Sequence, residues 1–171
     1  GLLAVSGVRV ALVAVGGVLI VIALATVRAL RNADSHADVP VVEMALLSSL
    51  PMFAPLPAGT LETVARAAER QRATKGEVVI RQGDSGDVFY AVAEGEFDID
   101  MNGVYLRTAP RGDFFGEVAL LSDVTRTATV TAATDGELLV IHREPFLLAI
   151  TGHESSLAAA AAYVVSLDLE E

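Results

Sequence analysis

The 171-residue sequence contains no cysteine and no tryptophan, and Lys75 is its single lysine. Without cysteine, the fold cannot depend on the disulfide framework that many small secreted domains use. Because Lys75 precedes its glycine, the sequence has no GxxxxGK loop for a nucleotide triphosphate. Hydrophobic residues make up 53% of the chain, which excludes a disordered or collagen-like protein and predicts a core of aliphatic side chains.

Histidine is also scarce, and the three residues of this type are His36, His142 and His153. A metal-binding jelly roll would need clustered histidines and carboxylates, so we expect no metal site. The stretch Gly83-Asp84-Ser85-Gly86 resembles the nucleophile segment of chymotrypsin-like proteases, but a nucleophilic serine needs a hydrogen-bonded histidine and an acid. No histidine lies in a supporting motif. The sequence therefore favours an exposed turn over a serine hydrolase, and an active-site probe should not label Ser85.

Positive charge is in short supply, and it is unevenly distributed. The net charge of −10 disfavours a nucleic-acid partner, which would need a basic patch. Residues 1–31 contain Arg9, Arg28 and Arg31 but no acidic residue, which leaves nine basic and 22 acidic residues, a net charge of −13, in the rest. This asymmetry indicates that the two parts of the chain lie in different surroundings.

Eighteen uncharged residues, 10–27, separate Arg9 from Arg28. As a helix they would be about 27 Å long, close to the ~30 Å hydrocarbon core of a bilayer. A secretory signal peptide usually has a shorter apolar region followed by a cleavage site of small residues, and a soluble helix usually keeps a polar stripe. The segment therefore predicts a transmembrane helix within residues 1–31, with the lipid bilayer as a partner.

Arg28 and Arg31 directly follow the apolar segment, and positively charged residues favour the cytoplasmic side. We therefore expect a protein of the cell membrane with residues 32–171 in the cytoplasm. The sequence begins with a glycine inside an apolar stretch, which predicts an upstream membrane domain on the same polypeptide.

The rest of the sequence predicts a linker at residues 32–42 and one domain at residues 43–168. The spacing of apolar residues predicts four helices, over 43–50, 58–70, 144–151 and 155–168. Between them the period changes to that of strands, which are predicted at 77–81, 88–93, 96–101, 104–108, 126–133 and 138–142. Asn102-Gly103 predicts a tight hairpin turn. The fold class is therefore α+β, a β-roll or jelly roll flanked by helices.

One segment carries the residues for a binding site. Gly116-Glu117 opens a short apolar helical turn between two predicted strands, and Arg126 follows nine residues after the glutamate. A helix N-terminus offers free N–H groups and a partial positive charge, Gly116 allows close approach of a ligand, and a guanidinium donates paired hydrogen bonds to phosphate. Glu117 suits a sugar hydroxyl. The pattern predicts a ligand whose phosphate and ribose lie close together.

Each of these residues also has an ordinary structural explanation. A Gly-Glu pair is usually a turn with a solvated glutamate, and a lone arginine is usually a surface charge. Their joint spacing favours the binding site. An arginine between apolar residues of a β-roll is also costly to bury without an anion.

The run from Phe115 to Val130, FGEVALLSDVTRTATV, resembles the phosphate-binding cassette of cyclic-nucleotide-binding domains. Such domains occur in protein kinase A regulatory subunits, cyclic-nucleotide-gated channels and the bacterial catabolite activator. The resemblance covers roughly residues 45–153. It extends to the glycine pattern of Lys75-Gly76, Gln82-Gly83-Asp84 and Glu94-Gly95, together with Phe89-Tyr90.

The resemblance implies a role for each residue of the cassette. Glu117 would hold the ribose 2′-hydroxyl and Arg126 would pair with the cyclic phosphate, while Thr127 would add a hydroxyl contact to phosphate or base. The expected ligand-binding residues are Gly116, Glu117, Val118, Ala119, Arg126, Thr127 and Ala128, with backbone N–H groups near Ala119 and Ala128 supporting the phosphate. In the C-terminal helix, Leu157 and Tyr163 are the candidates for a cap over the base. The favoured ligand is cAMP rather than cGMP.

The resulting hypothesis is a regulatory domain without catalysis of its own and without a cofactor. Nucleotide binding would shift the arrangement of the flanking helices, and residues 32–50 would pass that bias to the membrane domain. The short linker resembles the tail of a transporter of the major facilitator type. A cyclic-nucleotide-gated channel is one alternative, and a module that kept the fold but lost the ligand is another.

Overall fold

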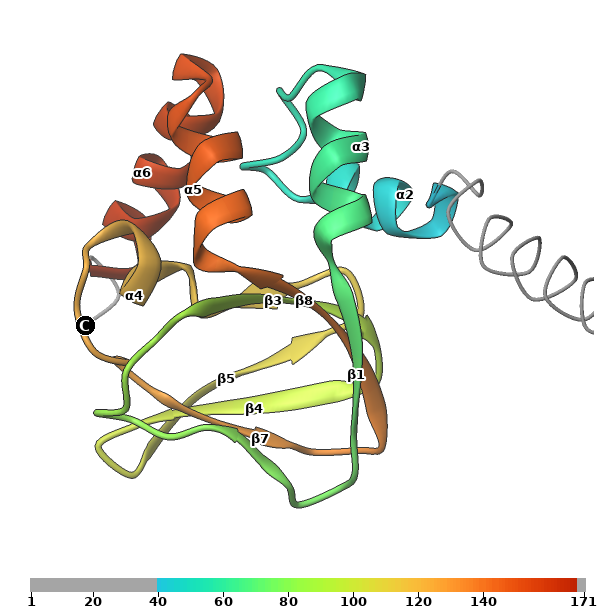
Figure 1. Ribbon diagram of the computed structural model, residues 1–171. Helices are drawn as coiled ribbons and strands as arrows, with labels where there is room; N and C mark the ends of the chain where they lie inside the picture. The colour runs from blue at the N-terminus through green and yellow to red at the C-terminus, as the bar shows by residue number, and fades with distance from the viewer. Residues whose placement is uncertain (1–39, 169–171) are drawn as a thin grey trace, which may run out of the picture. The chain divides into compact units, whose positions relative to one another are not determined.

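The structure is a computed structural model that describes residues 40–168 (Figure 1). The predicted transmembrane segment at 10–27 and most of the predicted linker at 32–42 lie outside the described residues. In the part that is described, no helix combines the length and the hydropathy that crossing a bilayer requires.

The strands form two four-stranded sheets in which all pairs are antiparallel. In spatial order, the first sheet contains β1 (Glu69–Ala73), β8 (Gly136–His142), β3 (Val88–Glu94) and β6 (Phe114–Phe115). The second contains β2 (Val78–Ile80), β7 (Thr129–Ala132), β4 (Glu96–Met101) and β5 (Val104–Pro110). Most neighbours in each sheet are far apart in the sequence. The predicted β-roll of an α+β fold is confirmed.

The hairpin between β4 and β5 forms where the sequence predicts it. Asn102 and Gly103 have φ angles of 53° and 78°, the left-handed conformation that a two-residue hairpin turn requires. Met101 pairs with Val104 directly across this turn. The predicted tight turn is confirmed.

Within residues 40–168, four helices flank the roll, and a fifth, very short one follows β6. They are α2 (Val41–Ser49), α3 (Ala58–Ala67), α4 (Glu117–Leu121), α5 (Arg143–Thr151) and α6 (Glu154–Asp168). Figure 1 shows α2, α3 and α5 gathered over the β3–β8 side of the roll, with α6 next to α5. Pro57 precedes α3, in keeping with the tolerance for proline at a helix entry.

Some predicted bounds are wrong, and in two cases tertiary contacts explain the difference. The helix predicted over 58–70 ends at Ala67 because the chain turns into β1, where Arg70 pairs with β8 and its guanidinium bonds Glu43 and Glu137. The strand predicted over 126–133 begins only at Thr129, since the Arg126 side chain is held in the pocket described below. The first helix begins at Val41, two residues early, and the two-residue β6 was not predicted.

Two hydrophobic cores lie on opposite faces of β3. Side chains in a strand alternate between faces, so Phe89 points to the helices and Tyr90 to the interior of the roll. Under the helices, the ring of Phe89 stacks on Phe146 with centroids 5.0 Å apart. Inside the roll, Tyr90 stacks on Phe115 at 5.2 Å. Strand β3 is therefore packed between aromatic residues on both of its faces.

Candidate functional site

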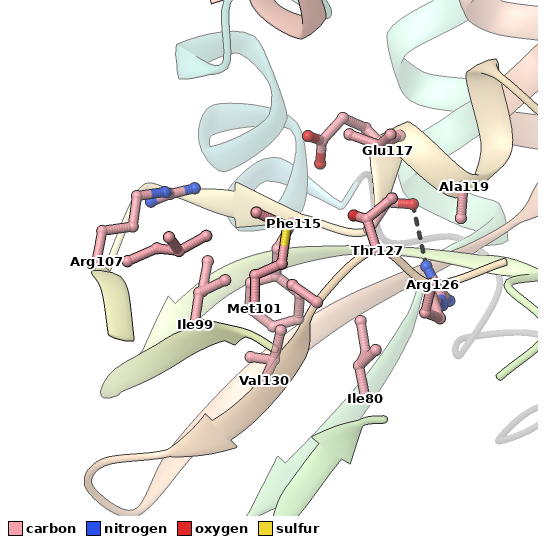
Figure 2. Close-up of a pocket in the computed structure, with 14 residues that line it drawn as sticks. Ile80, Ile99, Met101, Arg107, Phe115, Glu117, Ala119, Arg126, Thr127 and Val130 are labelled. Carbon is pink, nitrogen blue, oxygen red and sulfur yellow. Dashed lines mark hydrogen bonds between the residues drawn. The ribbon is translucent and has the colours of Figure 1, made fainter. Parts of the chain in front are cut away.

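A cavity of about 460 Å³ lies at α4, against the inner face of the second sheet (Figure 2). This volume suits a ligand the size of a nucleotide. All seven residues predicted to bind the ligand line this one cavity: Gly116, Glu117, Val118, Ala119, Arg126, Thr127 and Ala128. Its apolar lining comes from Ile80, Ile99, Met101, Leu106, Phe115 and Val130, and its remaining residue is Arg107.

The guanidinium of Arg126 occupies a slot between two glycines. At Gly116, with φ of 91°, an added Cβ would lie 2.7 Å from Arg126 Nη1. At Gly86, an added Cβ would lie 2.8 Å from Arg126 Nε and 2.7 Å from the Cβ of Ala119. All three distances are shorter than normal Cβ contacts, so a side chain at either glycine would displace the guanidinium from this slot.

Arg126 is buried, with 6% of its surface exposed, but it is not paired with an acid. Its Nη1 donates to the carbonyl oxygen of Gly116 at 3.0 Å, and its Nη2 donates to that of Val88 at 2.7 Å (Figure 2 draws the first bond). Within residues 40–168, no carboxylate lies at ion-pair distance from it. Burial lowers the pKa of Arg126 because it penalises the charged form. The protein thus holds a partly desolvated cation facing a cavity.

Glu117 is the second buried charged group of the cavity. It is 4% exposed, and among the described residues its Oε2 has no hydrogen-bond partner. Burial raises the pKa of Glu117 to about 7, while the nearby cations Arg107 and Arg126 lower it. A buried acceptor without a donor is unfavourable. A hydroxyl group of a ligand could supply that donor.

Arg107, on β5, lies across the cavity from Arg126 (Figure 2). Its Nη1 forms an ion pair with the Asp113 carboxylate. Its Nη2 donates to the carbonyl oxygen of Phe114 at 3.3 Å and to the hydroxyl of Tyr163 at 3.2 Å. The charge of this second arginine is therefore balanced by a carboxylate.

Arg143, the first residue of α5, supports the site from behind. Its Nη2 donates to the carbonyl oxygens of Gly86 and Ala119, each at 3.3 Å, and its Nη1 pairs with Asp123 at 3.0 Å. These contacts join the loop after β2, helix α4 and the helical layer. Arg143 thus links the loop at Gly86 to α4 at Ala119, beside the Arg126 guanidinium.

The sequence does not predict several residues that form or support the site: Arg107, Gly86, Arg143, and Tyr90, whose ring centroid lies 5.9 Å from the guanidinium carbon of Arg126. The pattern around Gly86 predicts only a turn, and no sequence pattern marks Arg107. The two candidates for a cap, Leu157 and Tyr163, do not line the cavity, because Tyr163 packs on Phe114 instead.

Within the described residues, the structure gives no site to the serine-hydrolase pattern or to a metal ion. Ser85 is exposed in the loop after β2. Across residues 40–168, no cluster of three histidine, aspartate or glutamate residues is arranged to hold a metal ion.

Comparison with protein families matches residues 70–153 to the family described as the cyclic nucleotide-binding domain. A cAMP-dependent protein kinase regulatory subunit from Aspergillus niger is 36% identical over 104 residues, which cover 60% of this chain and 25% of that protein. A candidate potassium channel protein from Rhodopseudomonas palustris is 33% identical over 122 residues, which cover 69% of this chain and 29% of that protein. The chain thus spans only about a quarter of the length of these relatives.

Among solved structures, the regulatory domain of Toxoplasma gondii PKA crystallised with cAMP superimposes with a TM-score of 0.66. It is 27% identical, and the match covers 76% of this chain and 52% of that one. A β-roll with a cavity at its short helix is typical of β-roll domains that bind small ligands. Residues 70–153 belong to the cyclic nucleotide-binding domain family, as the cassette at 115–130 predicts.

Proposed function

We propose that this chain is a regulatory domain that binds a cyclic nucleotide, with cAMP as its ligand. The proposal rests mainly on the burial and the hydrogen bonds of Arg126. This residue is buried beside a nucleotide-sized cavity and, among the described residues, hydrogen-bonded only to carbonyl oxygens. A guanidinium has five N–H donors, so it can bind a phosphate while keeping its two carbonyl contacts. One unbalanced positive charge matches the single negative charge of a cyclic phosphodiester.

The chemistry of the cavity orients the nucleotide. The phosphate would lie at Arg126, with Thr127 and the backbone near Ala119 and Ala128 beside it. The ribose 2′-hydroxyl would donate to Glu117, which supplies the missing donor of Oε2. The base would lie against the apolar lining. Since α4 has only five residues, the guanidinium rather than the helix end would supply most of the attraction for the anion.

The choice of cAMP rests on the relatives rather than on the cavity. The regulatory subunits that match this chain are described as cAMP-dependent, and the Toxoplasma gondii structure holds cAMP. The apolar lining contacts any base through its face and does not by itself distinguish adenine from guanine.

We further propose that residues 10–27 lie in the bilayer of the cell membrane, that residues 32–171 lie in the cytoplasm, and that nucleotide binding acts on an upstream membrane domain. The apolar segment flanked by Arg9 and Arg28 supports the membrane location. In this proposal, helix α2 passes the effect of nucleotide binding to the upstream segment. Glu43 attaches α2 to the roll, because its carboxylate pairs with Arg70 at 2.6 Å. In this proposal the domain neither catalyses a reaction nor binds nucleic acid.

The membrane domain is proposed to be a transporter of the major facilitator type, because the predicted linker at 32–42 is short. A cyclic-nucleotide-gated ion channel is the second candidate, and the 33% identity to the candidate potassium channel protein favours it. Recording from the complete polypeptide in a planar bilayer separates them. Potassium current that responds to cAMP would select the channel, and substrate flux without current would select the transporter.

Calorimetric titration of the 171-residue chain with cAMP, cGMP and 5′-AMP tests the binding proposal. We expect one site, with cAMP bound more tightly than cGMP and 5′-AMP bound weakly, since its open dianionic phosphate fits a single guanidinium poorly. The R72A variant should behave as wild type, because the Arg72 side chain is 90% exposed on β1. If neither cyclic nucleotide binds, the proposal is wrong and the ligand-free module is correct.

A further inference from the structure

Glu117 is a buried carboxyl group in the wall of the cavity. It is the first residue of α4, it is 4% exposed, and within residues 40–168 its Oε2 has no hydrogen-bond partner. In the same part of the chain, no arginine, lysine or histidine lies at ion-pair distance from it. Burial penalises the charged form of a carboxyl group. Without nucleotide, the pocket therefore favours the protonated form of Glu117.

Charged and titratable groups surround Glu117 on several elements. Burial raises the pKa of Glu117 to about 7, although its own backbone N–H group lowers it. Arg107 on β5 also lowers this pKa, Asp113 raises it, and Arg126 lowers it least. The neighbouring elements β3, α5 and α6 contribute three further groups: Tyr90, Arg143 and Tyr163. Burial outweighs these neighbours, so the carboxyl group can gain or lose a proton near neutral pH.

A cyclic nucleotide would change the hydrogen bonding of Glu117 more than its burial or its charged surroundings. The side chain is already buried, so the ligand adds little desolvation. The phosphate would neutralise Arg126, which has the smallest effect of the three charged neighbours on the pKa of Glu117. The ribose 2′-hydroxyl would supply the donor that Oε2 lacks. Because a hydrogen bond to a carboxylate is about twice as strong as one between neutral groups, the bound nucleotide favours the ionised form.

We infer that Glu117 links nucleotide binding to pH, because the nucleotide releases the proton of the Glu117 carboxyl group as it binds. The inference rests on the proposed function, and it assigns that site a means of regulation. The proton passes from the carboxyl group to water. Since binding couplings are reciprocal, a fall in pH must weaken nucleotide binding. The domain would therefore respond to acidification as well as to the concentration of the nucleotide.

Calorimetric titration of the full 171-residue chain with cAMP between pH 5.5 and pH 8 tests the inference. The affinity of the wild type should rise by about 5- to 10-fold over this range, the difference between a charged and a neutral hydrogen bond. Titrations at pH 6.5 in buffers of different ionisation enthalpy count the protons. We expect the wild type to release about half a proton for each cAMP bound.

Two variants assign the proton. In E117Q, whose amide does not ionise, both the rise in affinity and the proton release should disappear. E96Q is the matched control, because Glu96 is exposed on β4, and it should behave as wild type. His142 and His153 do not line the cavity, so any proton that they exchange should be the same in wild type and E117Q.

The outcomes separate the two proposals. If the wild type binds neither cAMP nor cGMP at any pH, the proposed function is wrong and the proton linkage falls with it. If the wild type binds with an affinity that stays constant or falls as the pH rises, or if E117Q keeps the wild-type pH dependence, the linkage alone is wrong.

The variant R107Q decides the question if E117Q binds too weakly to measure. It removes the cation that most lowers the pKa of Glu117, so the rise in affinity should move to higher pH. A pH dependence identical to that of the wild type would overturn the inference.

Discussion

The pocket has an arginine at each end, and the two arginines have different hydrogen-bond and ion-pair partners. Arg107 pairs with the carboxylate of Asp113, whereas Arg126 has only carbonyl oxygens as partners among the described residues. Arg126 is also the more deeply buried of the two. A positive side chain alone therefore does not make an anion site. The protein must also leave its charge unbalanced in a place that a ligand can reach.

The unbalanced end needs structural support, because burying an unpaired cation is unfavourable. Two glycines leave space for the guanidinium, and two carbonyl oxygens accept from it. The ring of Tyr90 lies beneath it, with the guanidinium carbon 5.9 Å from the ring centroid, a favourable cation–π distance. These contacts lower the free-energy penalty of burying the Arg126 guanidinium without neutralising its charge.

The largest expected effect follows from removing the unbalanced charge. R126A should weaken binding of cAMP by about 2–5 kcal/mol, as expected when one partner of a buried, hydrogen-bonded charge pair is truncated. The unfolding free energy without nucleotide should change little, since the lost carbonyl contacts are offset by relief of the buried charge. Calorimetry and urea denaturation measure the two quantities. Wild-type affinity in R126A would remove Arg126 from the site.

The next effect concerns Glu117, which lies in the field of both arginines. Its folded pKa of about 7 lies above the 4.5 of an unperturbed glutamate, so the folded state holds its proton more tightly than the unfolded chain. Its contribution to stability is therefore fully present below pH 4.5 and is lost as the pH rises to about 7. The loss corresponds to about 3 kcal/mol.

Urea denaturation of wild type and E117Q between pH 4.5 and pH 8 measures this contribution. The wild type should lose stability over this range relative to E117Q, whose amide does not ionise. E96Q is the control, because Glu96 is exposed on β4 and should leave the wild-type slope unchanged. Equal slopes in wild type and E117Q would contradict the burial of an uncompensated carboxyl.

A smaller effect should come from closing the slot around Arg126. In G86A the new Cβ would collide with Arg126 and Ala119, which should displace the guanidinium and cost about 1–3 kcal/mol of binding, a typical penalty for overpacking. G59A is a matched control, since a Cβ at Gly59 in α3 meets no atom within 4 Å. That control should bind normally and be slightly more stable, because alanine favours a helix. Normal binding by G86A, measured by calorimetry, would show that the slot does not matter.

The smallest effect is expected at the balanced end of the pocket. R107Q removes a charge that Asp113 already neutralises, so cAMP binding should weaken by only about 1 kcal/mol, the net value of a hydrogen bond. Calorimetry under the conditions used for R126A makes the comparison direct. A larger loss in R107Q than in R126A would reverse the roles that we assign to the two ends.

Parts of the fold with strong local signals could be predicted from the sequence. The turn at Asn102-Gly103 depends on two adjacent residues that tolerate positive φ, and it forms as predicted. Strand β1, with the sequence ERQRA, could not be predicted because Ala73 is its only buried residue. That strand exists through its pairing with β8, more than sixty residues further along the chain.

The residues of the site also divide into those that a local stretch of sequence predicts and those that only tertiary contacts bring together. Seven cassette residues could be placed together because they lie within one stretch, 116–128, that folds back on itself. Arg107 could not be predicted, since its position depends on the register of β5 and on contacts with Asp113 and Tyr163. Gly86 and Tyr90 likewise reach Arg126 only through tertiary packing. The membrane segment at 10–27 stays a prediction.

A crystal structure of the chain with cAMP would show which end of the pocket holds the phosphate. We expect the cyclic phosphate within hydrogen-bond distance of the Arg126 guanidinium, with the ribose 2′-hydroxyl at Oε2 of Glu117. A phosphate bound at Arg107, or a nucleotide bound outside the cavity, would contradict this expectation.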